Sequence, residues 1–84
     1  HPNPFNPSTT IRYTLPAASH VRIGVYDLAG REVAVLADGM QLEESQEVTW
    51  NGADAAGRAL GAGVYFARLE SDQGTGLTKM TLVK

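Results

Sequence analysis

The sequence contains no cysteine among its 84 residues. This absence excludes a thiol nucleophile, a disulfide and thiolate ligation of a metal. No apolar run approaches the ~20 residues that a membrane-spanning helix needs. The first residues, His1-Pro2-Asn3-Pro4, also lack the basic start and apolar middle of a signal peptide. Because the chain does not begin with Met, we expect it to be a module of a longer protein.

The sequence also lacks a strong charge of either sign. Seven Lys and Arg residues stand against nine Asp and Glu residues, for a formal charge of −2. Without a basic cluster to displace counterions from a phosphate backbone, we expect no nucleic-acid partner. A length of 84 residues with 43% apolar and 19% charged residues is typical of one soluble globular domain. We expect no internal repeat within it.

Apolar residues recur at every second position, which indicates strands. The alternation is clear over residues 9–15 and again over 21–25. A turn at 27–30 then joins the second segment to residues 33–35 as a β-hairpin. The polar interval 38–44 predicts a break before the next strand.

The second half of the chain continues this pattern. Val48 and Trp50 belong to a strand, and residues 51–57 are typical of a long loop. Residues 64–69 form another strand, although the pattern leaves open which of its faces points inward. A turn near 72–74 precedes a last strand that contains Leu77, Met80, Leu82 and Val83, with an irregularity between Leu77 and Met80.

No window has the apolar spacing of an amphipathic helix. Six or seven short strands separated by turns predict an all-β fold, an immunoglobulin-like or fibronectin III-like antiparallel β-sandwich. Residues 1–8 form an Asn/Pro-rich segment that leads into the sandwich of residues 9–84. The prolines fix their own φ and remove backbone donors, so this segment is expected to be a stiff edge or turn.

Candidate chemistry is sparse. His20 precedes a strand and has no serine elbow near it, so we expect a solvated histidine in a loop and no enzyme activity or cofactor. Asn51 and Asp54 are candidate calcium ligands, but both residue types also cap turns with their own side chains. Trp50 is expected to fill the core, with a sugar-binding platform as the alternative.

Five motifs occur in a characteristic order. They are Asn3-Pro4-Phe5-Asn6-Pro7-Ser8-Thr9-Thr10-Ile11, Val25-Tyr26-Asp27-Leu28-Ala29-Gly30-Arg31-Glu32-Val33, Trp50-Asn51-Gly52, Gly63-Val64-Tyr65-Phe66 and Lys79-Met80-Thr81-Leu82-Val83-Lys84. Over essentially its whole length, the chain resembles the C-terminal sorting domain of the type IX secretion system (Por secretion type A). In its middle it is also similar to the immunoglobulin-like domain of flagellar hook-capping proteins.

The first resemblance implies a non-catalytic module that directs an N-terminal passenger protein through the type IX translocon of Bacteroidetes-type bacteria. The implied route leads through the periplasm to the outer-membrane surface or the exterior. Implied partners are translocon components, a sortase-like peptidase and anionic lipopolysaccharide. The implied recognition residues are Lys79, Met80, Thr81, Leu82, Val83 and Lys84. Supporting residues would be Gly63, Val64, Tyr65, Asn3, Pro4, Asn6 and Pro7.

Two other functions stay open at this point. One is an accessory structural or carbohydrate-binding module of an extracellular enzyme, and the other is a hook-capping scaffold. In the sorting interpretation, a short terminal strand bounded by Lys79 and Lys84 offers an open sheet edge to which a receptor adds a strand. Gly63 is expected to have a positive φ, so that Gly63→Val would destabilise the domain.

Overall fold

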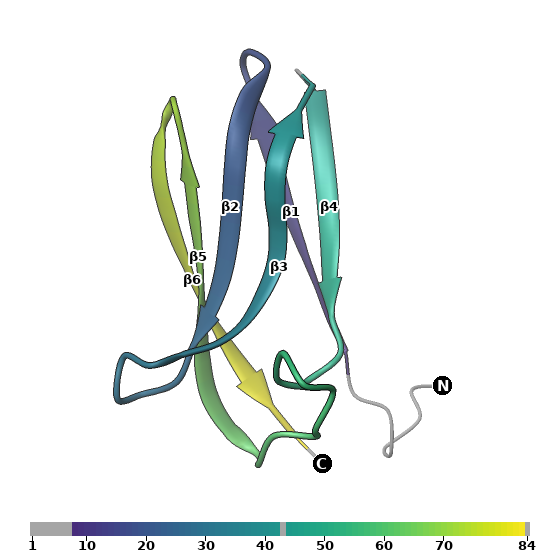
Figure 1. Cartoon of the computed structure of the whole chain (residues 1–84), viewed down its shortest axis with the longest axis vertical. Coiled ribbons are helices and arrows are strands. Elements are labelled where there is room, and N and C mark those ends of the chain that lie inside the picture. The colour runs from purple at the N-terminus through teal and green to yellow at the C-terminus, as the bar shows by residue number, and fades with distance from the viewer. Residues whose placement is uncertain (1–7, 43, 84) are drawn as a thin grey trace.

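The computed structural model of this chain describes residues 8–42 and 44–83, and six β-strands lie within them (Figure 1). In chain order the strands are β1 (Thr9–Leu15), β2 (Ser19–Tyr26), β3 (Glu32–Gln41), β4 (Glu44–Trp50), β5 (Gly63–Ser71) and β6 (Gly74–Leu82). No helix long and apolar enough to cross a membrane occurs in these two ranges. Asn3, Pro4, Asn6 and Pro7, to which the sequence assigned a supporting role, lie outside the described residues.

The strands form two antiparallel sheets that face each other (Figure 1). One sheet consists of β1 and β4, and the other has the order β3-β2-β5-β6. In the larger sheet β2 pairs with β3 on one side and β5 on the other, which leaves β3 and β6 at its two edges. The all-β immunoglobulin-like sandwich predicted from the sequence is confirmed.

The core lies between the sheets and follows from the alternation of apolar residues. Val21, Ile23 and Val25 of β2 are fully buried. Each such side chain contributes about 1.5–3 kcal/mol when it leaves water. The indole of Trp50 packs edge-on against Tyr65, with 5.2 Å between ring centroids, and its N–H donates to the carbonyl of Ala53. Trp50 is 2% exposed, so its predicted place in the core is confirmed.

The structure decides which faces of the last two strands point inward. Tyr65 and Ala67 of β5 are buried, as are Met80 and Leu82 of β6. The predicted irregularity in β6 is wrong, because its register with β5 is unbroken from one end to the other. Leu77 therefore stays on the outer face, where it is 67% exposed.

Two further expectations from the sequence are wrong in the region of β3. The polar interval is not a connection throughout, because β3 continues to Gln41 and β4 begins at Glu44. His20 lies within β2 and not in a loop, because its backbone pairs with Met40 of β3. Backbone pairing extends the hairpin through polar residues whose side chains point into solvent, so polarity alone did not mark the strand end.

Candidate interaction surfaces

The connection between β2 and β3 is a tight turn that a single carboxylate holds together. Oδ1 of Asp27 accepts hydrogen bonds from the backbone N–H groups of Ala29 and Arg31, both at 3.0 Å. Gly30 has φ +84°, a value that favours glycine, and its N–H donates to the carbonyl of Asp27. Asp followed three positions later by Gly is therefore the local reason that the chain reverses here.

The loop after β4 repeats this turn with the same chemistry. Oδ1 of Asp54 accepts from the N–H groups of Ala56 and Arg58, both at 2.9 Å, and Gly57 has φ +84°. Both turns have the pattern Asp-x-Ala-Gly-Arg. The expectation that the chain has no internal repeat is thus wrong for this short motif. The same five-residue pattern at 27–31 and 54–58 was its signal in the sequence.

In both turns the carboxylate faces inward and the arginine faces outward. The backbone N–H groups of Arg31 and Arg58 lower the pKa of Asp27 and Asp54, and the guanidinium groups lower it further from 3.2 and 3.1 Å. The aspartate side chains are 19% and 16% exposed, whereas both arginine side chains are 80% exposed. The part of each turn that a partner meets is therefore its guanidinium group.

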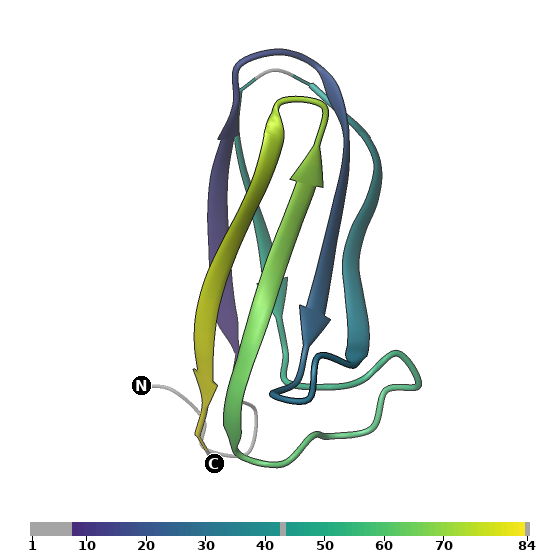
Figure 2. The same ribbon diagram turned by 90° about the vertical axis from the view of Figure 1, so that its left-hand side faces the viewer.

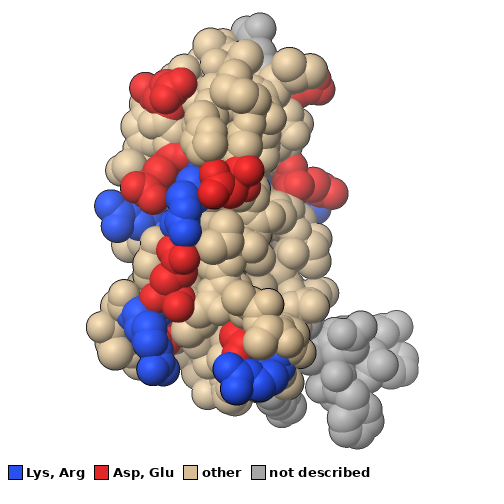
Figure 3. Space-filling model, viewed as in Figure 1, with Lys and Arg blue, Asp and Glu red and all other residues tan. Residues whose placement is uncertain are grey.

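The two turns lie at the same end of the molecule, where Figure 3 shows basic side chains. The N–H of Ala55 donates to the carbonyl of Val33 at 3.0 Å and so ties the second turn to β3. Arg31, Arg58 and Leu60 line an open hollow of about 410 Å³ between them. This end of the sandwich is one candidate interaction surface.

The candidate calcium ligands belong to this end and act as turn caps. Both oxygens of Asp54 accept hydrogen bonds within its turn, and Oδ1 of Asn51 accepts from the N–H of Ala53 at 3.1 Å. Both residues thus cap turns with their own side chains, which is one of the two roles that the sequence predicts for them. In the ranges 8–42 and 44–83, no group of three or more His, Asp or Glu side chains is arranged to hold a metal ion.

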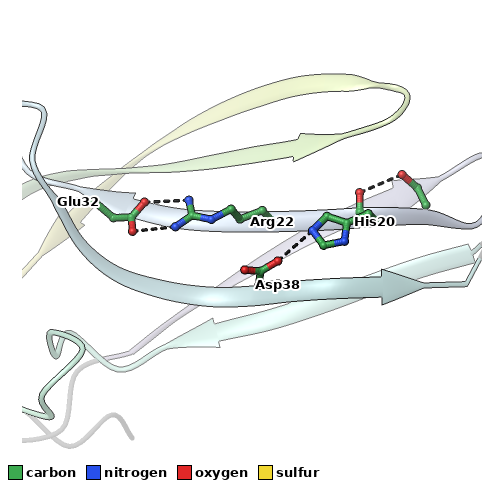
Figure 4. A network of polar contacts seen from close by, with 5 residues as sticks. His20, Arg22, Glu32 and Asp38 are labelled. Atoms are coloured by element: carbon green, nitrogen blue, oxygen red, sulfur yellow. Dashed lines mark hydrogen bonds and ion pairs between the residues drawn. The ribbon is translucent and has the colours of Figure 1, made fainter.

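The outer face of the larger sheet carries a second polar surface, across β2 and β3. Arg22 forms two hydrogen bonds of 2.8 Å with Glu32 (Figure 4). The hydroxyl of Tyr26 donates to the same carboxylate. These bonds lower the pKa of Glu32 and raise that of Arg22. Further along, Nε2 of His20 lies 2.9 Å from Oδ1 of Asp38 (Figure 4).

The residues that the sequence singled out near the end of the chain meet in the β5–β6 pair. Gly63 lies opposite Leu82, Val64 opposite Thr81, and Tyr65 opposite Met80. They do not share one surface: the side chains of Tyr65, Met80 and Leu82 are buried in the core. The exposed members of the proposed recognition segment are Lys79, Thr81 and Val83, and Lys84 lies outside the described residues.

A third surface is the free edge of the larger sheet at β6, beside β1 of the other sheet (Figure 2). Inward positions in the first half of β6 are occupied by small residues, Gly74, Gly76 and Thr78, and all three are exposed. An open hollow of about 330 Å³ lies here, lined by these glycines and by Tyr13, Leu15 and Leu69 among others. The sequence did not predict this hollow, although glycines at alternate strand positions were its signal.

Comparison with known proteins identifies a family and a similar solved structure. The family model described as FlgD Ig-like domain matches residues 6–75, more than half of the chain. The crystal structure of FlgD from P. aeruginosa is similar, with a TM-score of 0.71 and 26% sequence identity. The similarity covers 90% of this chain and 61% of that FlgD chain, so this chain spans less than two thirds of its length. No curated protein matches the sequence.

These comparisons overturn the sorting interpretation, because the matching model is that of the FlgD Ig-like domain and the matching structure is a FlgD. The implied type IX translocon, sortase-like peptidase and lipopolysaccharide partners are wrong, as is the implied route to the outer-membrane surface. The alternative of an accessory module in an extracellular enzyme is wrong for the same reason. The motifs misled because they specify turns and core positions of a shared sandwich, such as the turn at Asp27 and the buried Trp50.

Proposed function

This chain belongs to the FlgD Ig-like domain family, and we propose that it is a non-catalytic scaffold module of a flagellar hook-capping protein. The match of the family model over residues 6–75 is the observation that carries the proposal. The similarity to P. aeruginosa FlgD supports it, because it extends over 90% of this chain with the same fold. A scaffold module acts by holding its surfaces in fixed positions, and its chemistry lies in contacts with neighbouring proteins.

The polar side chains of the described residues support a role without catalysis. The imidazole of His20 is paired with Asp38 on the open face of the sheet. The hydroxyl of the buried Ser19 donates to the carbonyl of His20 and accepts from the N–H of Asp72. A serine whose hydroxyl is used for structure in this way, with no base facing it, lacks the arrangement that nucleophilic catalysis needs.

The structure also suits a module that must keep its shape under load. The core is continuous from Leu15 of one sheet to Leu82 of the other, and both Asp-x-Ala-Gly-Arg turns are closed by their own side chains. The connections at that end are thereby held in one conformation. Exposed arginines and open sheet edges then offer fixed contact surfaces to neighbouring subunits.

A domain exchange tests this proposal. The Ig-like domain of P. aeruginosa FlgD would be replaced by this chain, and hook formation and swimming would be measured in a strain without its own FlgD. We expect the chimera to support hooks and motility well above the strain that lacks FlgD. A chimera carrying Trp50→Ala serves as the control, because the loss of the core indole should strongly destabilise the module.

Protein levels decide how a failure is interpreted. A chimera that is present at normal levels and protease-resistant, yet gives no hooks, would contradict the proposal. Full function of a Trp50→Ala chimera whose module is readily digested by protease would also contradict it, because hooks would then form without a folded module.

A further inference from the structure

One edge of the four-stranded sheet is free for pairing. β6 has β5 as its neighbour on one side and no strand on the other within the described residues. In an antiparallel pair, alternate backbone N–H and C=O groups point away from the existing partner. Those groups of β6 can therefore bind a further strand.

β6 also lacks the features that usually protect such an edge. Its register with β5 runs without a shift from Gly63 opposite Leu82 to Ser71 opposite Gly74. The strand contains no proline and one charged residue, Lys79. Edges are normally protected by bulges, proline or several charges, and an edge without them pairs readily.

The inward-facing side chains of β6 differ in size and burial between its two halves. Its first half carries Gly74, Gly76 and Thr78, which are exposed, and the two glycines border the hollow beside β1. Its second half carries Met80 and Leu82, which are buried in the core. The strand thus has small residues and free space at one end, and large apolar residues at the other.

A second copy of β6, running antiparallel, places its large residues opposite the small residues of the first. When the strand pairs with itself about Thr78, its midpoint, all nine residues from Gly74 to Leu82 find a partner. Met80 of the second copy then lies opposite Gly76, and Leu82 of the second copy lies opposite Gly74. Each large side chain borders the free space that a glycine leaves in the other copy.

Charge and strand length together select this register over its two neighbours. Pairing about Lys79 would place the two ammonium groups directly opposite each other, which is unfavourable. Pairing about Leu77 would move Leu82 beyond Gly74 and leave it unpaired. In the register about Thr78, each Lys79 faces Leu77 of the other copy, whose side chain is 67% exposed in the single chain.

We propose that two copies of this chain associate through their β6 strands, antiparallel about Thr78, into one continuous eight-stranded sheet. The interface has two-fold symmetry and is therefore closed, so it gives dimers and not fibres. A strand of nine residues is short compared with the 20–30 residues per side of a standard interface, so the dimer is weak. This inference goes beyond the proposed function and does not depend on it.

Sedimentation velocity from about 10 µM to about 1 mM tests the association, with affinities in that range expected for a small interface. We expect a concentration-dependent monomer–dimer equilibrium for the unaltered chain. Thr78→Lys, at an exposed position, places two positive charges on the two-fold axis and should weaken association at least about tenfold. Thr78→Glu should do the same, and a mixture of the two variants should restore it.

The matched control is Thr49→Lys, which adds the same charge at an exposed position of β4, in the other sheet. It should leave association unchanged. The register is tested with Thr78→Cys, which gives the chain its single thiol. Mild oxidation should link two copies at residue 78, and Thr49→Cys should not give such a product.

Three results would each overturn the proposal. They are a purely monomeric chain at about 1 mM, undiminished association of Thr78→Lys with a melting temperature equal to that of the unaltered chain, and no cross-linked Thr78→Cys dimer. Equal loss of association in Thr49→Lys would point to charge in general and would also overturn it.

Discussion

The two edges of the four-stranded sheet differ in how well they are protected against pairing with a further strand. β3 shifts its register against β2 at two places, between Ile23 and Gly24 and between Val25 and Tyr26. β6 keeps one register with β5 throughout. Along β3, Glu32 and Asp38 are held by partners on β2, whereas β6 carries Lys79 as its one charge.

This difference indicates that the sheet has one protected edge and one available edge. Register shifts bend a strand, and charges on it disfavour the approach of a second strand. β3 also contacts β4 of the other sheet. β6 has small residues and a hollow at the corresponding place. An assembly contact made by strand pairing would therefore form at β6 and not at β3.

Trp50→Ala should have the largest effect, and it tests whether the stability of both edges depends on one core. Trp50→Ala removes a ring that is 2% exposed and contacts Tyr65 of β5 edge-on. We expect a loss of about 3–5 kcal/mol in the free energy of unfolding, measured by urea denaturation. Backbone amide exchange should accelerate in β3 and β6 together. Acceleration at one edge alone would show that the edges do not share this core.

Gly52→Ala should have a smaller effect, which disturbs the end of β6 and leaves β3 unchanged. Gly52 has φ +80°, and an added Cβ would lie 3.0 Å from Cδ1 of Leu82. Gly52→Ala should cost about 2–4 kcal/mol, from the strained φ and from displacement of that side chain.

Gly57→Ala is the matched control for this change. Gly57 has φ +84°, but nothing lies within 4 Å of an added Cβ, so the cost should be about 1–2 kcal/mol from the backbone alone. The difference between the two variants measures the contact at Leu82. Equal losses of stability would show that Gly52 does not act through β6.

Glu32→Gln should cause a still smaller loss of stability, which is confined to β3. Glu32→Gln breaks the paired hydrogen bonds with Arg22, whose side chain is about one third exposed. Solvent screens this pair, so the loss of stability should be smaller than that from Gly57→Ala. Amide exchange should accelerate in β3 and stay unchanged in β6. Glu47→Gln, which removes an exposed pair with Arg12, is the control and should change neither edge.

Lowering the pH should destabilise the folded chain, as Glu32→Gln does. The pKa of Glu32 lies below its ordinary value of 4.5, and the pKa values of Asp27 and Asp54 lie below 3.8. Groups with lowered pKa in the folded state bind fewer protons there than in the unfolded state. Their stabilisation is therefore complete above about pH 4.5 and is lost as the pH falls through the lowered values. The urea midpoint should follow this course, with a flatter dependence in Glu32→Gln.

Much of the fold could be predicted because strand alternation is a local signal. Residues 9–15 form β1, and the turn at Asp27 joins β2 to β3 as expected. The extension of β3 to Gln41 could not be predicted from polarity, because backbone pairing holds it. The place of Leu77 was missed because its direction depends on the register of β6 with β5.

The candidate surfaces were less predictable than the fold. Which residues of β6 border free space depends on where β1 lies, and the two strands are distant in sequence. The function was misassigned because Asp27-Leu28-Ala29-Gly30 and Trp50-Asn51-Gly52 encode turn geometry and core filling. Such motifs identify the sandwich, and they do not by themselves distinguish the families that share it.

Amide hydrogen exchange of the unaltered chain at two concentrations tests the difference between the edges most directly. We expect the amides of β6 to be more protected at about 1 mM than at about 10 µM, because a second copy pairs with them, while those of β3 stay the same. Protection that is independent of concentration at both edges, or that rises at β3 and not at β6, would contradict this account.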